Sequence, residues 1–525
     1  MSVGAETAGR VTDRAGDPSR RPGLLCVIAI GLVYGLAHSW LRLSISDTLA
    51  VDDIKSNVYT QTFELGYVPK QPPLYEWLLW LVQHLTGPTL PSFLILKYGL
   101  LTATFAFLYL AAKRIFDDDR WAMLAGLSPL MIYQIGWNVH EGVTQTMALV
   151  CAVAATMWAF MRMVERGRAG DYLLFGFAAG IGLITKYNFA AFLVILLSSA
   201  LLQPALRARL FDRRMLLSLG VGAAVVAPVV SWLIAERHDL VALYQTSIAP
   251  MAKKSWLEAR AIGLVKTLWV PFAFLFPLVA IVPFFPGTLR EGWTALKRGT
   301  TLSAWSGEEP DWRLFLLQMT LGGFIVLAFG ALATGATHYL ERYMHPFFLL
   351  TPLWLLALVK NSRGATRRSA ILAALFAIAA LAVFPIRAYD LINTMGGNCR
   401  KCRIAVPYEN LAAALKQRGF EPGTIVAVTR EDAGNLRRFF PEARVVRLER
   451  PRYEPPPRSV KSGDKFAVVW REGYRLPQEA KDEYAEIMRS LGATPERVLV
   501  SLQPSAKSAG HTFEWLVAVS DRPAP

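Results

Sequence analysis

Residues 23–41 read GLLCVIAIGLVYGLAHSWL, a run without a single Asp, Glu, Lys or Arg. A helix of this length is long enough to cross the hydrocarbon core of a bilayer. Residues 371–384, ILAALFAIAALAVF, have the same character. Of the 525 residues, 53% are hydrophobic and only 18% are charged, which is less charge than soluble proteins carry. The sequence therefore predicts an all-α polytopic membrane domain.

Hydropathy divides this domain into further runs of similar length. We expect about 11 transmembrane helices on this criterion, at 23–41, 92–112, 120–137, 145–161, 172–189, 190–204, 215–235, 262–285, 314–334, 344–359 and 369–385.

The basic residues are distributed unevenly on the two sides of these spans. The net charge of +16 would suggest a nucleic-acid partner in a soluble protein, but basic residues also orient membrane helices. The tail at 1–22 and the connectors on its side hold more than twice as many Lys and Arg as the opposite loops. We therefore expect a cytoplasmic tail, a retained signal-anchor, a periplasmic C-terminus and no nucleic-acid partner.

The chain changes character after residue 388. We expect a membrane domain at 23–388, with long periplasmic loops at 42–91 and 236–260, and a periplasmic α/β domain at 389–525. In the α/β domain we expect helices at 408–419, 431–441 and 476–492, and strands at 424–430, 443–448, 465–470, 497–502 and 513–520. Since no Gly-rich phosphate loop opens its helices, we expect a lid or docking domain without chemistry of its own.

Three other segments have simpler interpretations. Residues 75–85, YEWLLWLVQHL, predict an amphipathic helix in the membrane interface. Residues 286–313 read as a cytoplasmic loop without chemistry. Cys26 and Cys151 fall inside spans as packing residues, while Cys399 and Cys402 predict a local disulfide in an oxidising compartment.

Charged residues gather at the predicted periplasmic ends of the spans, where charge is costly unless it is hydrated, paired or used. Such a set suits a reaction that holds an anionic lipid headgroup while a hydroxyl loses its proton. Each residue also has a simpler interpretation: Asp52 and Asp53 as a solvated face, Lys186 as a lysine reaching the interface, and Arg342 as a helix anchor.

Five segments resemble a known family in the right order. The first is LAVDDIKSNVYTQTFELGYVPKQPPLYEWLLW at 49–80, with an acidic pair, Gly-Tyr and Pro-Pro-Leu-Tyr-x-Trp. The others are GLITKYNFAAFL at 182–193, HYLERYMHPFFLLTPL at 338–353, YENLAAALKQRGFEPGTIVAV at 408–428 and GNLRRFFPEARVV at 434–446. Together they resemble the GT-C glycosyltransferases of family 39/83, relatives of protein O-mannosyltransferases and of the aminoarabinose transferase that modifies lipid A.

The resemblance implies a GT-C fold and an inverting transferase in the bacterial inner membrane. The donor would be a polyprenyl-monophosphate sugar, and the acceptor an anionic envelope glycolipid such as lipid A or lipopolysaccharide core. We expect no cofactor. His140, Glu141 and His338 together could suggest a metal, but no ligand spacing is recognisable, so we do not expect a catalytic metal. The sugar itself stays open among galacturonic acid, aminoarabinose and mannose.

The resemblance also implies roles for individual residues. Asp52 would be the general base, and Asp53 the second candidate or an orienting partner. Lys70, Lys186 and Arg342 would bind the donor phosphate, although one additional residue before Pro-Pro leaves the direction of Lys70 open. Further substrate contacts are expected from Tyr67, Gln71, Tyr75, His140, Glu141, Tyr187, Asn188 and His338. Lys253 and Lys254 would attract an anionic acceptor.

Two other classes of protein compete with this hypothesis. A transporter or flippase of a lipid-linked substrate should show inverted repeats and ionisable residues at mid-membrane, and the sequence shows no internal repeat. An assembly protein that works through its soluble domain should lose all function when residues 389–525 are deleted.

Overall fold

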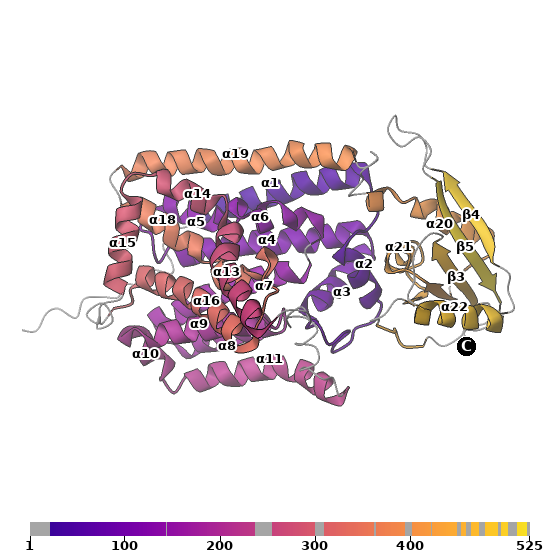
Figure 1. Cartoon of the computed structure of the whole chain (residues 1–525), viewed down its shortest axis with the longest axis horizontal. Coiled ribbons are helices and arrows are strands. Elements are labelled where there is room, and N and C mark those ends of the chain that lie inside the picture. The colour runs from indigo at the N-terminus through magenta and orange to yellow at the C-terminus, as the bar shows by residue number, and fades with distance from the viewer. Residues whose placement is uncertain are drawn as a thin grey trace, which may run out of the picture.

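Long apolar runs form a block of packed helices, and the α/β domain lies at one end of this block (Figure 1). The computed structural model describes residues 21–142, 144–236, 255–299, 309–361, 364–393, 402–421, 423–448, 453–457, 464–471, 478–491, 495–501 and 512–521. The expectations for Lys253, Lys254 and Cys399, and for the Cys402 side chain, lie outside this description.

Six helices in the described part of the chain are long and apolar enough to cross a membrane. They are α1 (Arg21–Ile45), α4 (Leu90–Ala112), α7 (Gln145–Arg166), α11 (Met215–Ala235), α16 (Trp312–Thr334) and α19 (Ala365–Ile392). Shorter apolar helices are α8 (Ala169–Leu183) and α9 (Phe189–Leu201). The predicted class, an all-α membrane domain followed by a small α/β domain, is confirmed, whereas the number of spans stays a prediction.

Prolines interrupt several stretches that hydropathy predicts as single transmembrane helices. The run 120–137 forms α5 (Asp119–Leu127), η3 (Ser128–Met131) and α6 (Tyr133–Gly136), with Pro129 at the break. The run 344–359 forms α17 (His345–Phe348) and α18 (Thr351–Asn361), and the run 262–285 forms α13 (Trp256–Leu275), α14 (Leu278–Ile281) and η5 (Val282–Phe284). Proline has no amide proton and disfavours helix at the preceding residue, which explains these corrections.

The remaining short helices lie in the connections. They are α2 (Asp52–Tyr59), α3 (Leu74–Thr86), η4 (Asn138–Glu141), α10 (Pro204–Leu210), α15 (Thr288–Gly299) and η7 (Glu341–Tyr343). Helix α15 lies within the predicted cytoplasmic loop at 286–313. In Figure 1, α10 and α15 lie at the end of the block opposite α2 and α3.

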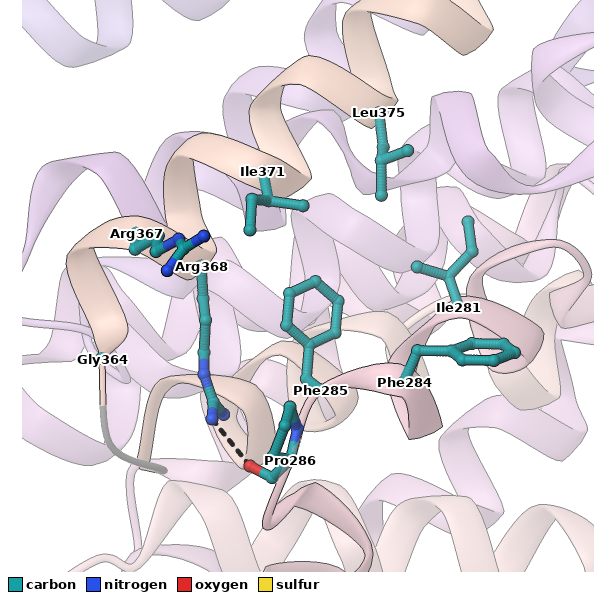
Figure 2. A pocket seen from close by; sticks show the side chains of 9 residues that line it. All are labelled: Ile281, Phe284, Phe285, Pro286, Gly364, Arg367, Arg368, Ile371 and Leu375. Carbon is teal, nitrogen blue, oxygen red and sulfur yellow. Dashed lines mark hydrogen bonds between the residues drawn. The ribbon is translucent and has the colours of Figure 1, made fainter.

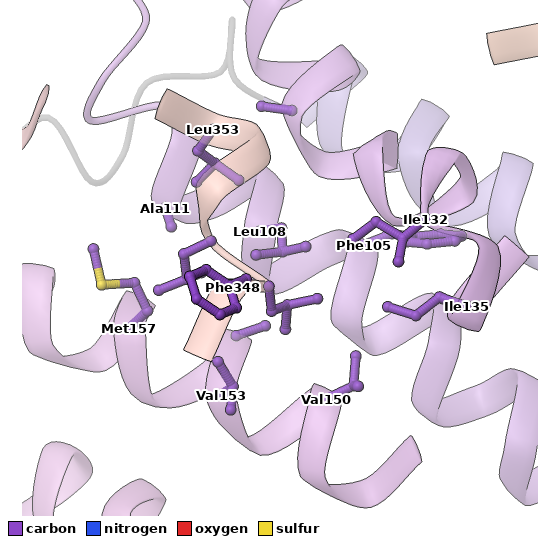
Figure 3. Packing of buried hydrophobic residues seen from close by; sticks show 14 of the residues in the cluster. Phe105, Leu108, Ala111, Ile132, Ile135, Val150, Val153, Met157, Phe348 and Leu353 are labelled. Carbon is purple, nitrogen blue, oxygen red and sulfur yellow. The ribbon is translucent and has the colours of Figure 1, made fainter. Parts of the chain in front are cut away.

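The core of the block is packed around α4 and α7. Figure 3 shows Phe348 of α17 among Leu108 of α4 and Val153 and Met157 of α7. All four side chains belong to one buried hydrophobic cluster. This packing fixes the neighbouring ends of α4 and α7, from which site residues project.

The α/β domain is built on a five-stranded mixed sheet with the strand order β2-β1-β3-β5-β4. Its strands are β1 (Gly423–Ala427), β2 (Arg444–Arg447), β3 (Lys465–Arg471), β4 (Glu496–Ser501) and β5 (Thr512–Ser520). Strands β1, β2 and β3 are parallel, and β5 runs antiparallel to both β3 and β4. The helices are η8 (Cys402–Ala405), α20 (Tyr408–Gln417), α21 (Arg430–Phe439) and α22 (Gln478–Leu491).

Alternation along β1 gives the sheet two buried faces. Ile425 packs in one cluster with Leu411 of α20 and Leu436 of α21, whereas Val426 packs on the other face with Tyr484 of α22. Every strand and helix predicted for this domain is present with small shifts of its ends. The division of the chain at residue 388 and the sidedness of the two termini stay predictions.

Candidate active site

The acidic pair begins the short helix α2, and its two carboxylates lie in different surroundings. The Asp52 side chain is 41% exposed, and its Oδ1 lies 3.0 Å from Lys55 Nζ. Val51, immediately before it, has φ of 56°, a left-handed conformation that a β-branched residue rarely adopts. Such strain persists only where the surroundings hold the backbone, so the start of α2 is a constrained position.

Asp53 points into the protein. Its Oδ2 lies 4.0 Å from Lys97 Nζ of α4, and both side chains are buried. In the described part of the chain its other oxygen, Oδ1, has no hydrogen-bond partner. Burial raises the pKa of Asp53 above its usual range, while the Lys97 charge opposes this shift. Asp52 is therefore the accessible carboxylate of the pair, and Asp53 is the anchored one.

Lys186 lies in the connection between α8 and α9, within electrostatic range of Asp52. Its Nζ donates a hydrogen bond of 2.8 Å to Thr146 Oγ1 in the first turn of α7. Burial lowers the pKa of Lys186 to about 8, opposed by the Asp52 carboxylate and reinforced by the Lys55 and Arg342 cations. Asp52, Lys55 and Arg342 therefore all lie within electrostatic range of the Lys186 ammonium.

Arg342 enters this region from η7. It is exposed, its guanidinium lies 5.2 Å from the Tyr343 ring centroid, and its Nη2 is 3.4 Å from Tyr343 Oη. An exposed guanidinium near a partly buried ammonium forms a positive region in which a phosphate group can be held.

Glu76 of α3 is a candidate that the sequence analysis missed. It is buried, and its Oε1 accepts hydrogen bonds from Ser56 Oγ of α2 at 3.1 Å and from Gln145 Nε2 of α7 at 2.6 Å. Burial raises the pKa of Glu76 to about 7, against these hydrogen bonds, which lower it. A lone acid in the apolar run YEWLLWL was the available signal, because a carboxylate there must be paired or used.

Tyr75 lies next to all three acids. It is fully buried, and its hydroxyl has no hydrogen-bond partner among the described residues. Burial, followed by the negative charges of Asp53, Glu76 and Asp52, raises the pKa of Tyr75 well above its usual value. The hydroxyl therefore stays protonated and is available as a donor.

The turn before α3 is fixed by a residue from the Lys186 connection. Tyr187 Oη donates a hydrogen bond of 2.8 Å to the Pro69 carbonyl, and Gln71 pairs with Val68 across the turn. Lys70 at the tip is exposed. In this same connection Asn188 Oδ1 is buried without a described partner. Two predicted segments, residues 67–71 and 186–188, therefore meet.

Two other predicted substrate contacts, Tyr67 and His338, have aromatic neighbours. Tyr67 is buried against Tyr59 and Tyr453, with ring centroids 5.8 and 5.2 Å away, and its hydroxyl donates to the Thr62 carbonyl at 2.9 Å. His338 is exposed, 6.2 Å from the Tyr343 ring centroid.

His140 and Glu141 belong to a buried polar cluster behind Asp53. His140 hydrogen-bonds with Tyr34 Oη at 2.9 Å and Tyr98 Oη at 2.8 Å. Glu141 lies 4.0 Å from Arg403. A cavity of about 30 Å³ separates these groups, lined by Arg42, Ala50, Val51, Asp53, His140, Glu141, Gly142, Leu391, Arg403 and Ile404. Within the described ranges, no three His, Cys, Asp or Glu side chains are placed to hold a metal ion.

A larger cavity of about 670 Å³ lies near the start of α19, and none of the predicted residues lines it. Figure 2 shows its apolar wall, with Phe285 and Ile371, and Arg368 donating a hydrogen bond of 2.7 Å to the Pro286 carbonyl. Arginines at a helix end are typical of membrane-protein orientation, so this cavity is not part of the candidate site.

Comparisons with known proteins give consistent matches. Residues 70–232 match the family described as dolichyl-phosphate-mannose-protein mannosyltransferase. Lipopolysaccharide core galacturonosyltransferase RgtA of Rhizobium johnstonii is 29% identical over 449 residues, covering 83% of this chain and 85% of that protein. Its relative RgtB from the same organism is 25% identical over 457 residues, covering 86% and 88%.

Solved structures match the fold over nearly the whole chain. The crystal structure of ArnT from Cupriavidus metallidurans bound to undecaprenyl phosphate has a TM-score of 0.55 at 14% identity, covering 96% of this chain and 100% of that one. The apo structure of the same protein has a TM-score of 0.54, with coverages of 95% and 98%. At this identity the likeness concerns the fold alone.

Proposed function

We propose, because the chain is a membrane glycosyltransferase with the GT-C fold, that it moves a sugar from a polyprenyl-monophosphate donor to an envelope glycolipid. The donor class is supported by the family description and by the undecaprenyl phosphate in the ArnT structure. The acceptor, lipopolysaccharide core or lipid A, and galacturonic acid as the first sugar to test are supported by the names of both relatives. The reaction would take place at the periplasmic face of the inner membrane.

One observation carries the proposal: the accessible carboxylate of Asp52 and the cation of Arg342 both lie within electrostatic range of the Lys186 ammonium. Transfer of a sugar from a phosphate to a hydroxyl requires a base that accepts the hydroxyl proton and positive charge that stabilises the departing phosphate.

The proposed reaction proceeds by a single displacement. Asp52 accepts the proton of the acceptor hydroxyl while its oxygen forms a bond to the anomeric carbon. The bond between that carbon and the phosphate oxygen breaks, and the electron pair leaves with the polyprenyl phosphate. Lys186 and Arg342 stabilise the charge on the leaving phosphate. Attack opposite the leaving group inverts the anomeric configuration.

Other residues receive supporting roles in the proposal. Asp53 holds α2 through Lys97. The Tyr75 hydroxyl, which has no hydrogen-bond partner among the described residues, is a donor for a bound substrate, and the turn with Lys70 and Gln71, held by Tyr187, contacts the donor lipid. Asn188 contacts the sugar. For Tyr67, His140, Glu141 and His338 the surroundings favour roles in maintaining the structure.

A transfer assay in proteoliposomes tests the function. Purified protein receives polyprenyl-phosphate sugars that differ only in the sugar, together with lipopolysaccharide core as the acceptor. We expect turnover with wild type and a loss of about 10²- to 10⁴-fold in kcat for Asp52→Asn, the typical contribution of a general base. Asp482→Asn, an equivalent change on the exposed face of α22, should be as active as wild type.

Two outcomes would contradict parts of the proposal separately. Full activity of a folded Asp52→Asn variant would remove the assignment of the base. Transfer from nucleotide sugars, with none from any polyprenyl-phosphate sugar, would overturn the donor class.

A further inference from the structure

We propose that helix α21 of the C-terminal domain is a positioning element of the active site, which holds α2 and with it Asp52. The inference rests on the proposed function for the role of Asp52, whereas the attachment of α21 to α2 stands on the contacts alone. Figure 1 shows α21 facing α2 at the junction between the helical block and the α/β domain.

Arg437 of α21 is inserted between α2 and α3. Its side chain is buried, and its guanidinium donates to the side-chain oxygens of Thr60 at 2.8 Å, Gln83 at 3.1 Å and Asn57 at 3.3 Å. It also donates to the Thr60 carbonyl at 2.7 Å and to the Asn57 carbonyl. These hydrogen bonds come from Nη1 and Nη2, whereas Nε has no partner among the described residues. A buried guanidinium is costly unless its donors are satisfied, so the bonds that Arg437 does make favour keeping the end of α2 in place.

Asn435, two residues earlier, holds the other end of α2. Its Oδ1 accepts a hydrogen bond of 2.8 Å from the Leu49 amide, and its Nδ2 donates to the Leu49 carbonyl at 3.2 Å. Leu49 lies just before the strained Val51 and the acidic pair. The amide side chain thus satisfies a backbone segment that belongs to neither helix nor strand, and fixes the approach to Asp52.

Gly434 brings the two helices into backbone contact. A Cβ atom at this position would lie 2.3 Å from the Ile54 carbonyl oxygen, a distance that no side chain can occupy. The Gly434 carbonyl accepts a hydrogen bond of 2.8 Å from Asn57 Nδ2. In addition, Val58 of α2 is buried in the same hydrophobic cluster as Leu411 and Leu436 of the C-terminal domain. Helix α2 therefore completes the core of that domain.

A helix of eight residues is not stable by itself, because few hydrogen bonds offset the cost of its first turn. The position of Asp52 therefore depends on contacts from both sides: Asp53 with Lys97 and Ser56 with Glu76 on the side of the membrane domain, and α21 on the other side. Displacement of a reacting group by about 1 Å reduces the rate by about 10²-fold. The C-terminal domain is thus part of the catalytic geometry, although its residues do not touch the reacting atoms.

The test compares Arg437→Met with Arg418→Met, the same substitution at an arginine that pairs with Glu496 within the domain at 2.8 Å. Three quantities are measured: kcat, affinity for polyprenyl phosphate, and hydrogen exchange of the amides at 52–59. For Arg437→Met we expect kcat to fall by about 10- to 100-fold, faster exchange at 52–59 and affinity within about threefold of wild type, because Lys186 and Arg342 are held elsewhere. Arg418→Met should match wild type in all three.

Gly434→Ala provides a second route should Arg437→Met not fold, and Arg437→Lys should recover part of kcat. Unchanged exchange at 52–59 in a folded variant would overturn the inference, as would a fall in phosphate affinity equal to the fall in kcat. If instead the wild type transfers no polyprenyl-linked sugar while the exchange behaves as expected, the proposed function fails and the attachment of α2 stands.

Discussion

Gln145, in the first turn of α7, donates a hydrogen bond of 2.6 Å to Glu76 on α3. The same glutamate oxygen accepts a hydrogen bond from Ser56 on α2, and the next residue of α7, Thr146, accepts one from Lys186. A single carboxylate therefore connects the helix of the proposed base with the helix that orients the proposed phosphate-binding lysine.

Replacement of Glu76 by Gln should stabilise the protein at alkaline pH. The folded-state pKa of about 7 lies above the ordinary value of 4.5, so stability is lost as pH rises through about 7 and the buried carboxyl ionises. Gln keeps the acceptor oxygen without the charge. We expect the variant to gain stability over wild type at pH 8.5, on the order of 3 kcal/mol at most, and little at pH 4.

Thermal unfolding in detergent at both pH values measures this difference. Glu76→Ala serves as the control, because it leaves the buried Ser56 and Gln145 donors without an acceptor and should destabilise by about 1–3 kcal/mol at either pH. An equal melting temperature of Glu76→Gln and wild type at pH 8.5 would contradict the prediction.

The pH dependence of donor use should report Lys186. Its pKa of about 8 means that the ammonium loses its proton, and with it the attraction for phosphate, as pH rises through that value. We expect kcat/KM for the donor to fall above about pH 8, since this ratio reports groups of the free enzyme. In Lys186→Arg the guanidinium keeps its charge, so the alkaline fall should disappear. A fall at the same pH in both proteins would assign it to another group.

Asp52 and Asp53 should respond in opposite ways to the same substitution. Asp53→Asn leaves Lys97 buried without its counter-charge and should cost about 3–5 kcal/mol of stability. Asp52 is an exposed residue, for which Asn should change stability by less than about 0.5 kcal/mol while turnover is lost. The double variant Asp53→Asn with Lys97→Met should recover most of the lost stability. Unfolding and kcat are measured on all four proteins, and similar stability of the two single Asn variants would refute the contrast.

Removal of one hydroxyl should loosen the turn that carries Lys70. Tyr187→Phe deletes the donor to the Pro69 carbonyl, a hydrogen bond worth about 1 kcal/mol at an exposed site. We expect KM for the donor to rise by about threefold to tenfold, with kcat and melting temperature nearly unchanged. Tyr133→Phe, at another exposed tyrosine, is the control. A fall in kcat alone would place Tyr187 at the reacting atoms instead.

Short-range sequence patterns correctly predicted those helices and strands that are determined by short-range interactions. The apolar runs at 92–112 and 215–235 correspond closely to α4 and α11, and alternation identified every strand of the C-terminal sheet. Three predicted spans consist of more than one helix in the structure, because hydropathy averages over a residue that breaks a helix. In these cases the apolar composition favours one continuous span, whereas the proline interrupts the helix.

For the candidate site, the sequence could predict on which side of the membrane each residue lies, but not which residues contact it. Counting spans predicts that Asp52, Lys186 and Arg342 share one side of the membrane, and the electrostatic effect of Asp52 and Arg342 on Lys186 agrees with this. The difference between Asp52 and Asp53 could not be read from the sequence, since it depends on Lys97 in another helix. Glu76 was missed for the same reason: its partners lie 20 and 69 residues away along the chain.

The hydrogen bonds of Arg437 with α2 and α3 also have a consequence for the biogenesis of the protein. Asn57 emerges from the ribosome 380 residues before the arginine that holds it. The six described helices that are long enough to cross a membrane are therefore synthesised before the segment that fastens the proposed base. On the proposed role of α21, a chain that terminates before Arg437 would enter the bilayer without fixing α2 and would not consume the donor lipid.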